Sequence, residues 1–497
     1  MFMITSQHLM HVRPGASHKP MKKPARKTAP QGHQAHTQSA AAAGLQGTMQ
    51  RPIKVTMLGA GSGFTPRLVN DLLLTPGNRG GEIALVDIDR KRLDAMRGVI
   101  TKLISKTGAK GWKVSASPDR RAVLKGTDYI VNCIEVSGLD CVRHDNDIPA
   151  RYGIDQCIGD TIGPGGLFKG LRTIPVWLDV LRDAERLCPQ AIVLNYTNPM
   201  GMLCAAASRT SRLSVVGLCH SVQGTGHLLA HRAGVPYHEM EWECAGINHL
   251  AWFVKLRHQG RDLYPDLMKK ARADLAGKPA DAKDAKDLVR KDMMIHFGAF
   301  ITESSGHLSE YLPYYRKRKD LVDKYCRDRY DGESSFYANN WPTWRAESDK
   351  ERAEMLKGKG QLGWDRSWEY ASWIIEAREK DCPTRIHGNI MNCRDGAGPV
   401  ISNLPHDGCV EVSCMVDSTG IHPTRFGALP PQMAAVSASN MPMISLAAQA
   451  AAERSKEMAI HALLLDPLTA AVLSPAEIKK MVLEMFAAES VFLPGYR

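Results

Sequence analysis

The chain of 497 residues is predicted to be an α/β protein, in which a Rossmann-type parallel sheet is followed by a mixed α/β domain. Three features of the sequence predict this class. Short apolar runs recur through the first half, and helix-patterned segments separate them. A glycine-rich turn directly follows the first run, and acidic residues end the second. Strands that alternate with helices in this way favour a parallel sheet with right-handed crossovers.

The first two strand and helix units carry the clearest pattern. The apolar run 53–58 enters a glycine-rich turn at 59–63, and a helix is expected over 66–74. This order is strand, tight turn, helix. A second strand is expected at 83–89, followed by an amphipathic helix over 90–105. Further strands are expected at 129–133, 191–195 and 214–218.

The second half is less regular and is expected to be mixed α/β. The charged stretch 278–291 is typical of a solvated helix or loop, 408–413 is strand-like, and 434–465 is rich in Ala and Met at helical spacing. The predicted division is a leader at 1–48, a Rossmann domain at 49–243 and a C-terminal catalytic and substrate domain at 244–497.

The leader carries half of the net charge of +12, because it holds six Lys and Arg residues and no Asp or Glu. It lacks apolar periodicity and the apolar core of a signal peptide, so we expect a disordered extension, or an upstream start ahead of Met49. A nucleic-acid-binding arm is the alternative, but a basic tail alone is weak support for one, and no nucleic-acid partner is expected.

Cysteine usage and hydropathy bear on the compartment. The twelve cysteines are scattered singly along the chain, which argues against a disulfide framework and favours the cytoplasm. No apolar run approaches the roughly 20 residues that cross a bilayer, so no membrane partner is expected.

The glycine-rich turn predicts a dinucleotide site. Glycines at 59 and 61 permit a tight turn and a close approach of the backbone to a pyrophosphate, although Phe64 stands where a third glycine is usual. A plain turn is the alternative. An acid at the end of the next strand can bind the adenosine ribose, which favours NAD over NADP. The predicted cofactor-binding residues are Gly59, Gly61, Ser62, Phe64, Asp87 and Asp89.

A metal site is predicted beside this turn. Cys219 directly follows the strand 214–218, the polar segment 195–199 ends another predicted strand, and 160–166 makes a polar glycine loop. Polar groups from several strand ends can converge on one ligand. With His249 and oxygen donors, Cys219 suits Mn, Fe, Co or Ni in an open site better than a closed structural zinc. An inert core cysteine and a structural histidine are the alternatives.

Two further segments are candidates for chemistry. The aromatic cluster 311–315 is either a packed patch or the source of a tyrosinate base, because a nearby cation favours the ionised phenol. Arg143 is either a substrate ligand or one half of a surface ion pair.

Taken together, these segments resemble glycoside hydrolase family 4, the NAD- and Mn²⁺-dependent glycosidases, and within it the melibiose-cleaving α-galactosidases. The match begins near residue 53 and runs to near the C-terminus, and it leaves out the leader. The matching segments are 59–62, 160–166, 195–200, 219–225, 244–249, 302–305 and 403–405.

The resemblance implies a fold like that of lactate and malate dehydrogenases, and a homodimer or homotetramer. It implies that Cys219 and His249 bind the metal and that Arg143 and Asn198 bind substrate. Tyr311 matches the tyrosine that abstracts a proton. The acid is an Asp after the metal cysteine in the phospho-glycosidases, where this chain has His220, so His220 and Asp160 are both candidates. The same difference argues against a 6-phosphorylated substrate.

The implied activity is hydrolysis of α-galactosides such as melibiose, by oxidation at C3, deprotonation at C2, elimination, addition of water and re-reduction. An α-glucosidase or an α-galacturonidase of the same family is the alternative. A plain NAD-dependent hydroxy-acid dehydrogenase is a rival from another class, and it would produce net NADH. A non-catalytic NAD-sensing protein is a third possibility, which would leave glycosides intact.

Overall fold

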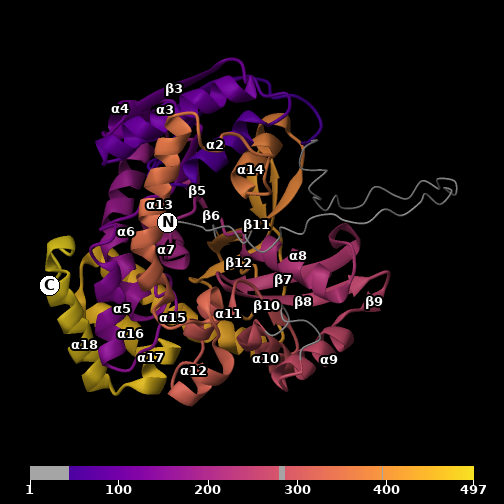
Figure 1. Ribbon diagram of the computed structural model, residues 1–497, viewed down its shortest axis with the longest axis vertical. Helices are drawn as coiled ribbons and strands as arrows, with labels where there is room; N and C mark the ends of the chain where they lie inside the picture. The colour runs from indigo at the N-terminus through magenta and orange to yellow at the C-terminus, as the bar shows by residue number, and fades with distance from the viewer. Residues whose placement is uncertain (1–43, 279–285, 394–395) are drawn as a thin grey trace.

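The computed structural model describes residues 44–278, 286–393 and 396–497 (Figure 1). Its strands form one 13-stranded sheet with the order β10-β8-β7-β12-β11-β6-β5-β4-β1-β2-β3, while β13 pairs with β12 and β9 with β8. The predicted class is therefore confirmed: a parallel Rossmann-type half is followed by a mixed half.

The parallel half has the strand order 3-2-1-4-5-6, which is the doubly wound dinucleotide-binding order. All five strands expected in this half are present. β3 was not expected, because Lys113, Ser115 and Ser117 make its sequence too polar to stand out. The bounds are β1 Ile53–Leu58, β2 Gly81–Val86, β3 Trp112–Ser117, β4 Tyr129–Asn132, β5 Ile192–Asn195 and β6 Ser214–Gly217.

Helices cover both faces of this half. α3 starts where the Asp89 side chain accepts a hydrogen bond from Arg92 N, and it ends at Gly108, which is left-handed. α6 is the longest, and apolar neighbours bury most of it. The bounds are α2 Thr65–Leu73, α3 Arg90–Thr107, α4 Arg121–Leu124, α5 Val142–Arg151, α6 Gly163–Leu187, α7 Met200–Thr210 and α8 Ser221–Ala233.

The antiparallel half continues the sheet from β6 through β11. The sheet has two narrow joins. The halves meet where β11 pairs with β6 only through Asn389 opposite Gly217, and within the antiparallel half β12 pairs with β7 only through Glu411 opposite Gly246. The strand expected at 408–413 is confirmed within β12. The bounds are β7 Met240–Ile247, β8 Leu250–His258, β9 Arg261–Asp262, β10 Phe300–Ile301, β11 Thr384–Met391, β12 Cys409–Asp417 and β13 Gly420–Pro423.

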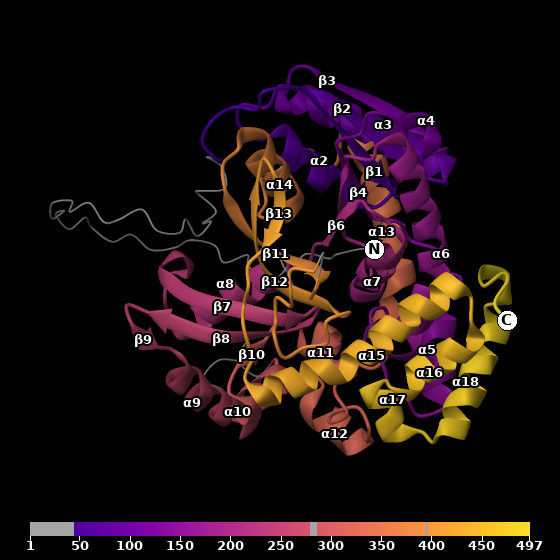
Figure 2. The ribbon, with the colours of Figure 1, turned by 180° about the vertical axis from the view of Figure 1, so that it is seen from behind.

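The last four helices return to the parallel half and pack beside α5 and α6 (Figure 2). The single helical stretch expected at 434–465 is two helices, because Arg454 is left-handed and the Ser455 side chain caps the next helix. The bounds are α15 Pro431–Glu453, α16 Lys456–Leu464, α17 Pro467–Val472 and α18 Pro475–Ala488.

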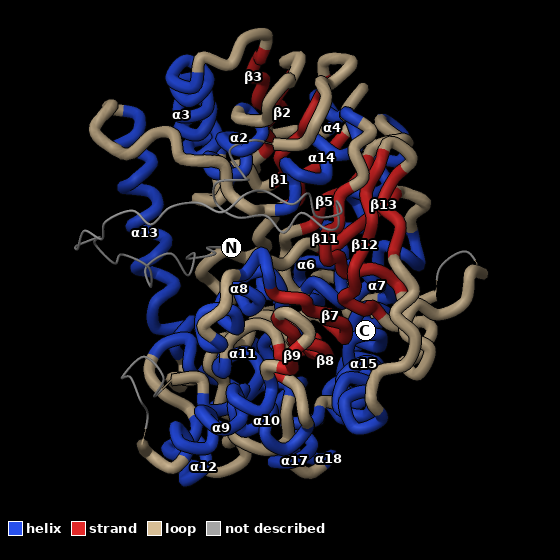
Figure 3. The backbone as a smooth tube through the Cα atoms, turned by 90° about the vertical axis from the view of Figure 1, so that its right-hand side faces the viewer, coloured by secondary structure: helices blue, strands red, loops and turns tan. Residues whose placement is uncertain are grey.

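The helices of the central segment lie around the antiparallel half, apart from α13, which runs along one side of the molecule (Figure 3). Their bounds are α9 Tyr264–Leu275, α10 Leu288–Phe297, α11 Ser305–Tyr311, α12 Lys319–Tyr325, α13 Phe336–Leu356 and α14 Tyr370–Lys380. Among the described residues, none of the helices is both long and apolar enough to cross a membrane.

The expectations for the charged stretch 278–291 and for the leader 1–48 concern segments that the structure describes only in part. Of the stretch expected to be solvated, 279–285 lies outside the described residues, but Lys291 is buried and its Nζ lies 2.6 Å from Asp274 Oδ2. Most of the leader also lies outside, although Leu45 N donates to Glu376 Oε1 at 2.8 Å, so its last residues contact the fold. The domain boundary at 243 stays a prediction, since the sheet crosses it without a break.

Candidate active site

The glycine turn between β1 and α2 is built for close approach to a ligand. Gly59 has φ of +70°, and a Cβ there would lie 2.3 Å from the Cys133 carbonyl oxygen. A Cβ on Gly61 would lie 2.8 Å from Asp87 Oδ2. Neither position tolerates a side chain, so the backbone N–H groups that follow stay open to a phosphate. These residues fit a dinucleotide.

The two acids after β2 have different partners. Gly61 N donates to Asp87 Oδ2 at 2.7 Å, which holds this carboxylate beside the turn. The exposed Asp89 instead caps α3 through Arg92 N. The structure therefore favours Asp87 over Asp89 as the ribose ligand.

The other two predicted cofactor residues shape the turn. Ser62 Oγ accepts a hydrogen bond from Phe64 N at 3.2 Å. The Phe64 ring is buried and packs edge-on against Tyr196, with ring centroids 5.3 Å apart. At the usual third-glycine position, an aromatic ring thus anchors the start of α2 in the core.

A candidate metal centre lies at the ends of three elements. Cys219 follows β6, His249 lies in the turn between β7 and β8, and Glu303 follows β10. Their ligand atoms all lie within 4.8 Å of one another, and His249 Nε2 is 3.9 Å from Glu303 Oε2. Three protein donors of sulfur, nitrogen and oxygen type leave positions open for substrate, as in a catalytic rather than a structural site.

The electrostatics of the three groups suit a cation. Burial, followed by the effect of His307, lowers the pKa of His249 to about 4, so its imidazole is neutral at pH 7. Burial and the nearby Glu411 and Glu303 raise the pKa of Cys219 well above its usual value. Burial opposes ionisation of Glu303, but His307 and His249 outweigh it and lower the pKa. A divalent cation would favour the thiolate of Cys219 and be balanced by the Glu303 carboxylate.

Several buried polar atoms around this centre have no hydrogen-bond partner among the described residues. They include Asn198 Oδ1, His249 Nδ1 and both polar atoms of the Asn248 side chain. Buried polar groups are normally paired, so these atoms point to a polar ligand. Asn198 follows β5, which pairs with β6, so it lies at the same sheet edge as Cys219.

A second group of potential ligands, Cys141, His144 and Glu489, is less suited to a metal. The buried Arg172 guanidinium already bonds Glu489 Oε2 and pairs with Asp145. This guanidinium supplies the positive charge that a metal would otherwise bring. Within the part of the chain that the structure describes, no Lys or Arg forms an ion pair with the ligands at Cys219, so we take that centre as the candidate site.

Asp160 is buried and held as a carboxylate. Lys169 Nζ lies 3.3 Å from Asp160 Oδ2, and Thr161 Oγ1 donates to Oδ1 at 2.6 Å. Burial disfavours its charge, but Lys169 and His307 outweigh this and hold the pKa far below the usual value. An acid this strong has no proton to give at pH 7, which favours His220 over Asp160 as the proton donor.

His220 has a partner that the sequence did not reveal. Its Nδ1 lies 3.7 Å from Glu369 Oε1, and the imidazole is partly exposed while the carboxylate is buried. Burial raises the pKa of Glu369 to about 7, against the opposing effect of His220. The Glu369 carboxyl is therefore partly protonated near neutral pH.

Tyr311 ends α11 and is fully enclosed. Its ring centroid lies 6.4 Å from that of His249, and His307, one turn earlier on α11, packs edge-on against His249 at 4.6 Å. Burial, followed by the carboxylates of Asp160 and Glu310, raises the pKa of Tyr311 well above its usual value. The phenol can act as a base only with a cation beside it.

Arg143 does not contact this group of residues in the described structure. Its guanidinium is half exposed, donates to Asn339 Oδ1 at 3.0 Å, and lies 3.7 Å from Asp147 Oδ1. The Arg143 side chain on α5 is directed toward α13. In this structure Arg143 therefore has the contacts expected from the surface ion-pair alternative.

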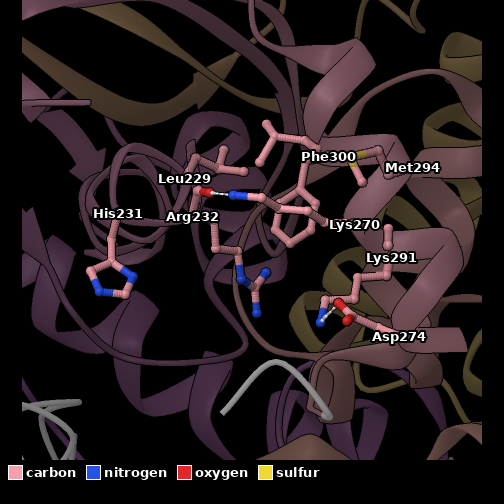
Figure 4. A pocket seen from close by; sticks show the side chains of 10 residues that line it. Leu229, His231, Arg232, Lys270, Asp274, Lys291, Met294 and Phe300 are labelled. Carbon is pink, nitrogen blue, oxygen red and sulfur yellow. Dashed lines mark hydrogen bonds and ion pairs between the residues drawn. The ribbon is translucent and has the colours of Figure 1, made fainter. Parts of the chain in front are cut away.

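A cavity of about 150 Å³ lies elsewhere, between α8, α9, α10 and β10 (Figure 4). Its cations are engaged: Lys291 pairs with Asp274, and Lys270 donates to the Arg232 carbonyl oxygen at 2.7 Å. None of the predicted site residues lines it, so it is separate from the metal centre.

Sequence reasoning assigned no role to several residues that the structure places around the centre. Glu303 lies in a segment that carries the family resemblance, so only its chemistry as an oxygen donor could have singled it out. The contacts of the others depend on long-range folding. These residues are Glu135, Lys169, Glu303, His307 and Glu369.

A doubly wound sheet with a dinucleotide turn and an open Cys/His/Glu centre defines a Rossmann-type enzyme built for a nucleotide cofactor and a metal. The sequence matches the Family 4 glycosyl hydrolase model over residues 54–235 and the corresponding C-terminal domain model over 244–469. The chain belongs to this family, which confirms the predicted resemblance.

Relatives match along nearly the whole length. An alpha-galactosidase of Bacillus subtilis is 38% identical over 450 residues, covering 89% of this chain and 100% of its own, and one of Rhizobium meliloti is 37% identical, covering 89% of each. The crystal structure of a 6-phospho-alpha-glucosidase from gut microorganisms, in complex with NAD and Mn²⁺, has the same fold, with a TM-score of 0.72 at 20% identity, covering 90% of this chain and 100% of its own.

Proposed function

We propose that this protein hydrolyses α-galactosides of the melibiose type, with NAD⁺ and a divalent metal, Mn²⁺ or another such as Co²⁺, Ni²⁺ or Fe²⁺, as cofactors. The observation that carries the proposal is the centre of Cys219, His249 and Glu303, which lies at the same sheet edge as the glycine turn. Whole-length similarity to two alpha-galactosidases supports the sugar.

The proposed reaction assigns a role to each of several site residues. Bound NAD⁺ would supply hydride transfer from the sugar and back to it, and a metal held by Cys219, His249 and Glu303 would polarise the carbonyl group of the oxidised sugar. Tyr311 removes the adjacent C2 proton, which the neighbouring ketone has acidified. His220, supported by Glu369, protonates the leaving oxygen, while Asn198 accepts a hydrogen bond from a sugar hydroxyl. The Arg143 contact with substrate stays a prediction from the resemblance.

The proposal is tested by cleavage of p-nitrophenyl α-galactoside, α-glucoside and α-galacturonide under reducing conditions, with and without NAD⁺ and Mn²⁺. We expect release of p-nitrophenol only when both are present, and fastest from the galactoside. Fastest release from another sugar would reassign the substrate within the family. No release, together with NADH formation from a hydroxy acid, would replace the proposal with a dehydrogenase.

The effect of replacing Glu369 is expected to depend on whether the leaving group of the substrate needs a proton. In Glu369→Gln, cleavage of melibiose should fall about 10- to 100-fold, because a sugar alkoxide must be protonated as it leaves. Cleavage of p-nitrophenyl α-galactoside should change by less than about threefold, since p-nitrophenolate leaves without a proton. Because the folded carboxyl has its pKa at about 7, wild-type activity on melibiose should fall as the pH rises through 7.

The matched control is Asp365→Asn, which removes an exposed acid on the same segment and should leave both rates unchanged. Equal losses on both substrates in Glu369→Gln would rule out a role in protonating the leaving group.

The compartment and the assembly are part of the proposal. All twelve cysteines are free thiols, which supports a cytoplasmic enzyme. We propose a homodimer or homotetramer, which sedimentation of the purified protein would reveal.

A further inference from the structure

α13 contacts both Arg143 on α5 and the glycine turn after β1. Figure 3 shows it running along one side of the molecule, from the level of α3 toward that of α12. Near its start, Asn339 accepts the hydrogen bond from Arg143, and near its end, Arg352 Nη2 donates to the Gly61 carbonyl oxygen at 2.7 Å. A residue far downstream in the sequence thus reaches the glycine turn.

One hydrogen-bond donor of Arg352 has no acceptor among the described residues. Its side chain is buried, and Nη1 donates to Asp349 Oδ1 at 2.7 Å. Its Nε–H is buried without a hydrogen-bond partner among the described residues. An unpaired, charged donor in a buried place is costly, so it indicates an acceptor that belongs to a ligand.

The surroundings of Arg352 indicate an anion. Arg92 Nη2 of α3 lies 2.8 Å from Asp349 Oδ2, so two guanidinium groups share the single carboxylate of Asp349 on this side of the turn. Asp87, on the β2 side, is the acid expected at the ribose. The turn itself offers backbone N–H groups at the start of a helix, where phosphates bind.

We propose that Arg352 is a ligand of the cofactor's pyrophosphate, and that α13 is therefore a wall of the dinucleotide site. The proposal rests on the proposed use of NAD⁺. A guanidinium gives two or more N–H groups to a phosphate, and these charge-assisted bonds are about twice as strong as neutral ones. Since the hydride returns to the same cofactor in each cycle, tight retention of NAD⁺ does not slow turnover.

The first test is calorimetric titration of NAD⁺ into wild type and Arg352→Gln, without substrate or metal. We expect Kd to rise about 10- to 100-fold, the loss typical of a charged hydrogen bond. Lys350→Gln removes the same charge from an exposed position of α13, and its Kd should stay that of wild type. Arg352→Lys keeps the charge without the fork, so we expect an intermediate Kd, and it replaces the glutamine variant if that does not fold.

The second test separates contact with the pyrophosphate from support of the turn. ADP-ribose and adenosine are titrated into the same variants, with NMR signals of the ligands as the readout. Loss of affinity for ADP-ribose with unchanged affinity for adenosine is the expected result. Equal losses for both ligands would mean that Arg352 only shapes the turn, and this would overturn the proposal.

The outcomes separate the two proposals. If wild type binds NAD⁺ and Arg352→Gln binds it equally well, the role of Arg352 is wrong and the proposed function stands. If wild type itself does not bind NAD⁺, the proposed function fails and this inference fails with it.

Discussion

Replacing Cys219 with alanine is expected to lower kcat for p-nitrophenyl α-galactoside by about 1,000-fold or more, because a metal that polarises a carbonyl supplies several kcal/mol of transition-state stabilisation. The thiol is buried and lies with His249 and Glu303 around a common point. Without its sulfur only two protein donors remain, too few for the metal to be retained. The measurement is kcat together with the Mn²⁺ content of the purified protein after dialysis.

Cys204→Ala is the matched control for this prediction. Cys204 is another buried thiol, and it packs in the same small apolar cluster as Cys219. Its loss leaves a similar cavity but removes none of the three ligands. We expect this variant to keep its metal and most of its activity. A Cys219→Ala protein that holds Mn²⁺ as wild type does would contradict the assignment of the centre.

Replacing Tyr311 with phenylalanine should lower kcat by about 100- to 10,000-fold, which is the range for loss of a general base. The substitution removes only the hydroxyl of a fully buried ring, so packing beside His249 is kept. NAD⁺ and Mn²⁺ should bind as in wild type, because the phenol is not among their predicted ligands. The measurement is kcat on the galactoside, with exchange of the C2 proton into deuterated water as a second readout.

Tyr314→Phe tests whether any tyrosine hydroxyl of this cluster would have the same effect. Tyr314 lies three residues later, and its side chain is exposed. Activity should be unchanged in this variant. If Tyr311→Phe continued to exchange the C2 proton at the wild-type rate, another group would have to be the base.

The cofactor half of the site could be predicted from the sequence because its signals are local. A strand, a glycine turn and an acid at the end of the next strand follow one another within 40 residues, and the structure brings Gly61 and Asp87 into contact. Cys219 was found in the same way, since it ends a buried strand. The predicted strands and helices were therefore confirmed mainly in the parallel half.

The rest of the site depends on contacts between distant segments, which the pattern of one segment does not report. Glu303 meets Cys219 only because β10 lies in the antiparallel half of the same sheet. Glu369 meets His220 across about 150 residues of sequence. Arg143 was a candidate substrate ligand and Asp89 a candidate ribose ligand. In the structure Arg143 donates to the Asn339 amide of α13, and Asp89 caps the start of α3.

The candidate metal ligands Cys219 and His249 each lie just beyond one of the two narrow joins of the sheet. The junction residue Gly217 lies two positions before Cys219, and Gly246 lies three before His249. A twist at these joins would therefore change the separation between the Cys219 sulfur and the His249 nitrogen. A metal bound to both Cys219 and His249 would link the segments on the two sides of these joins. Its removal should therefore lower the stability of the whole molecule as well as stop the reaction.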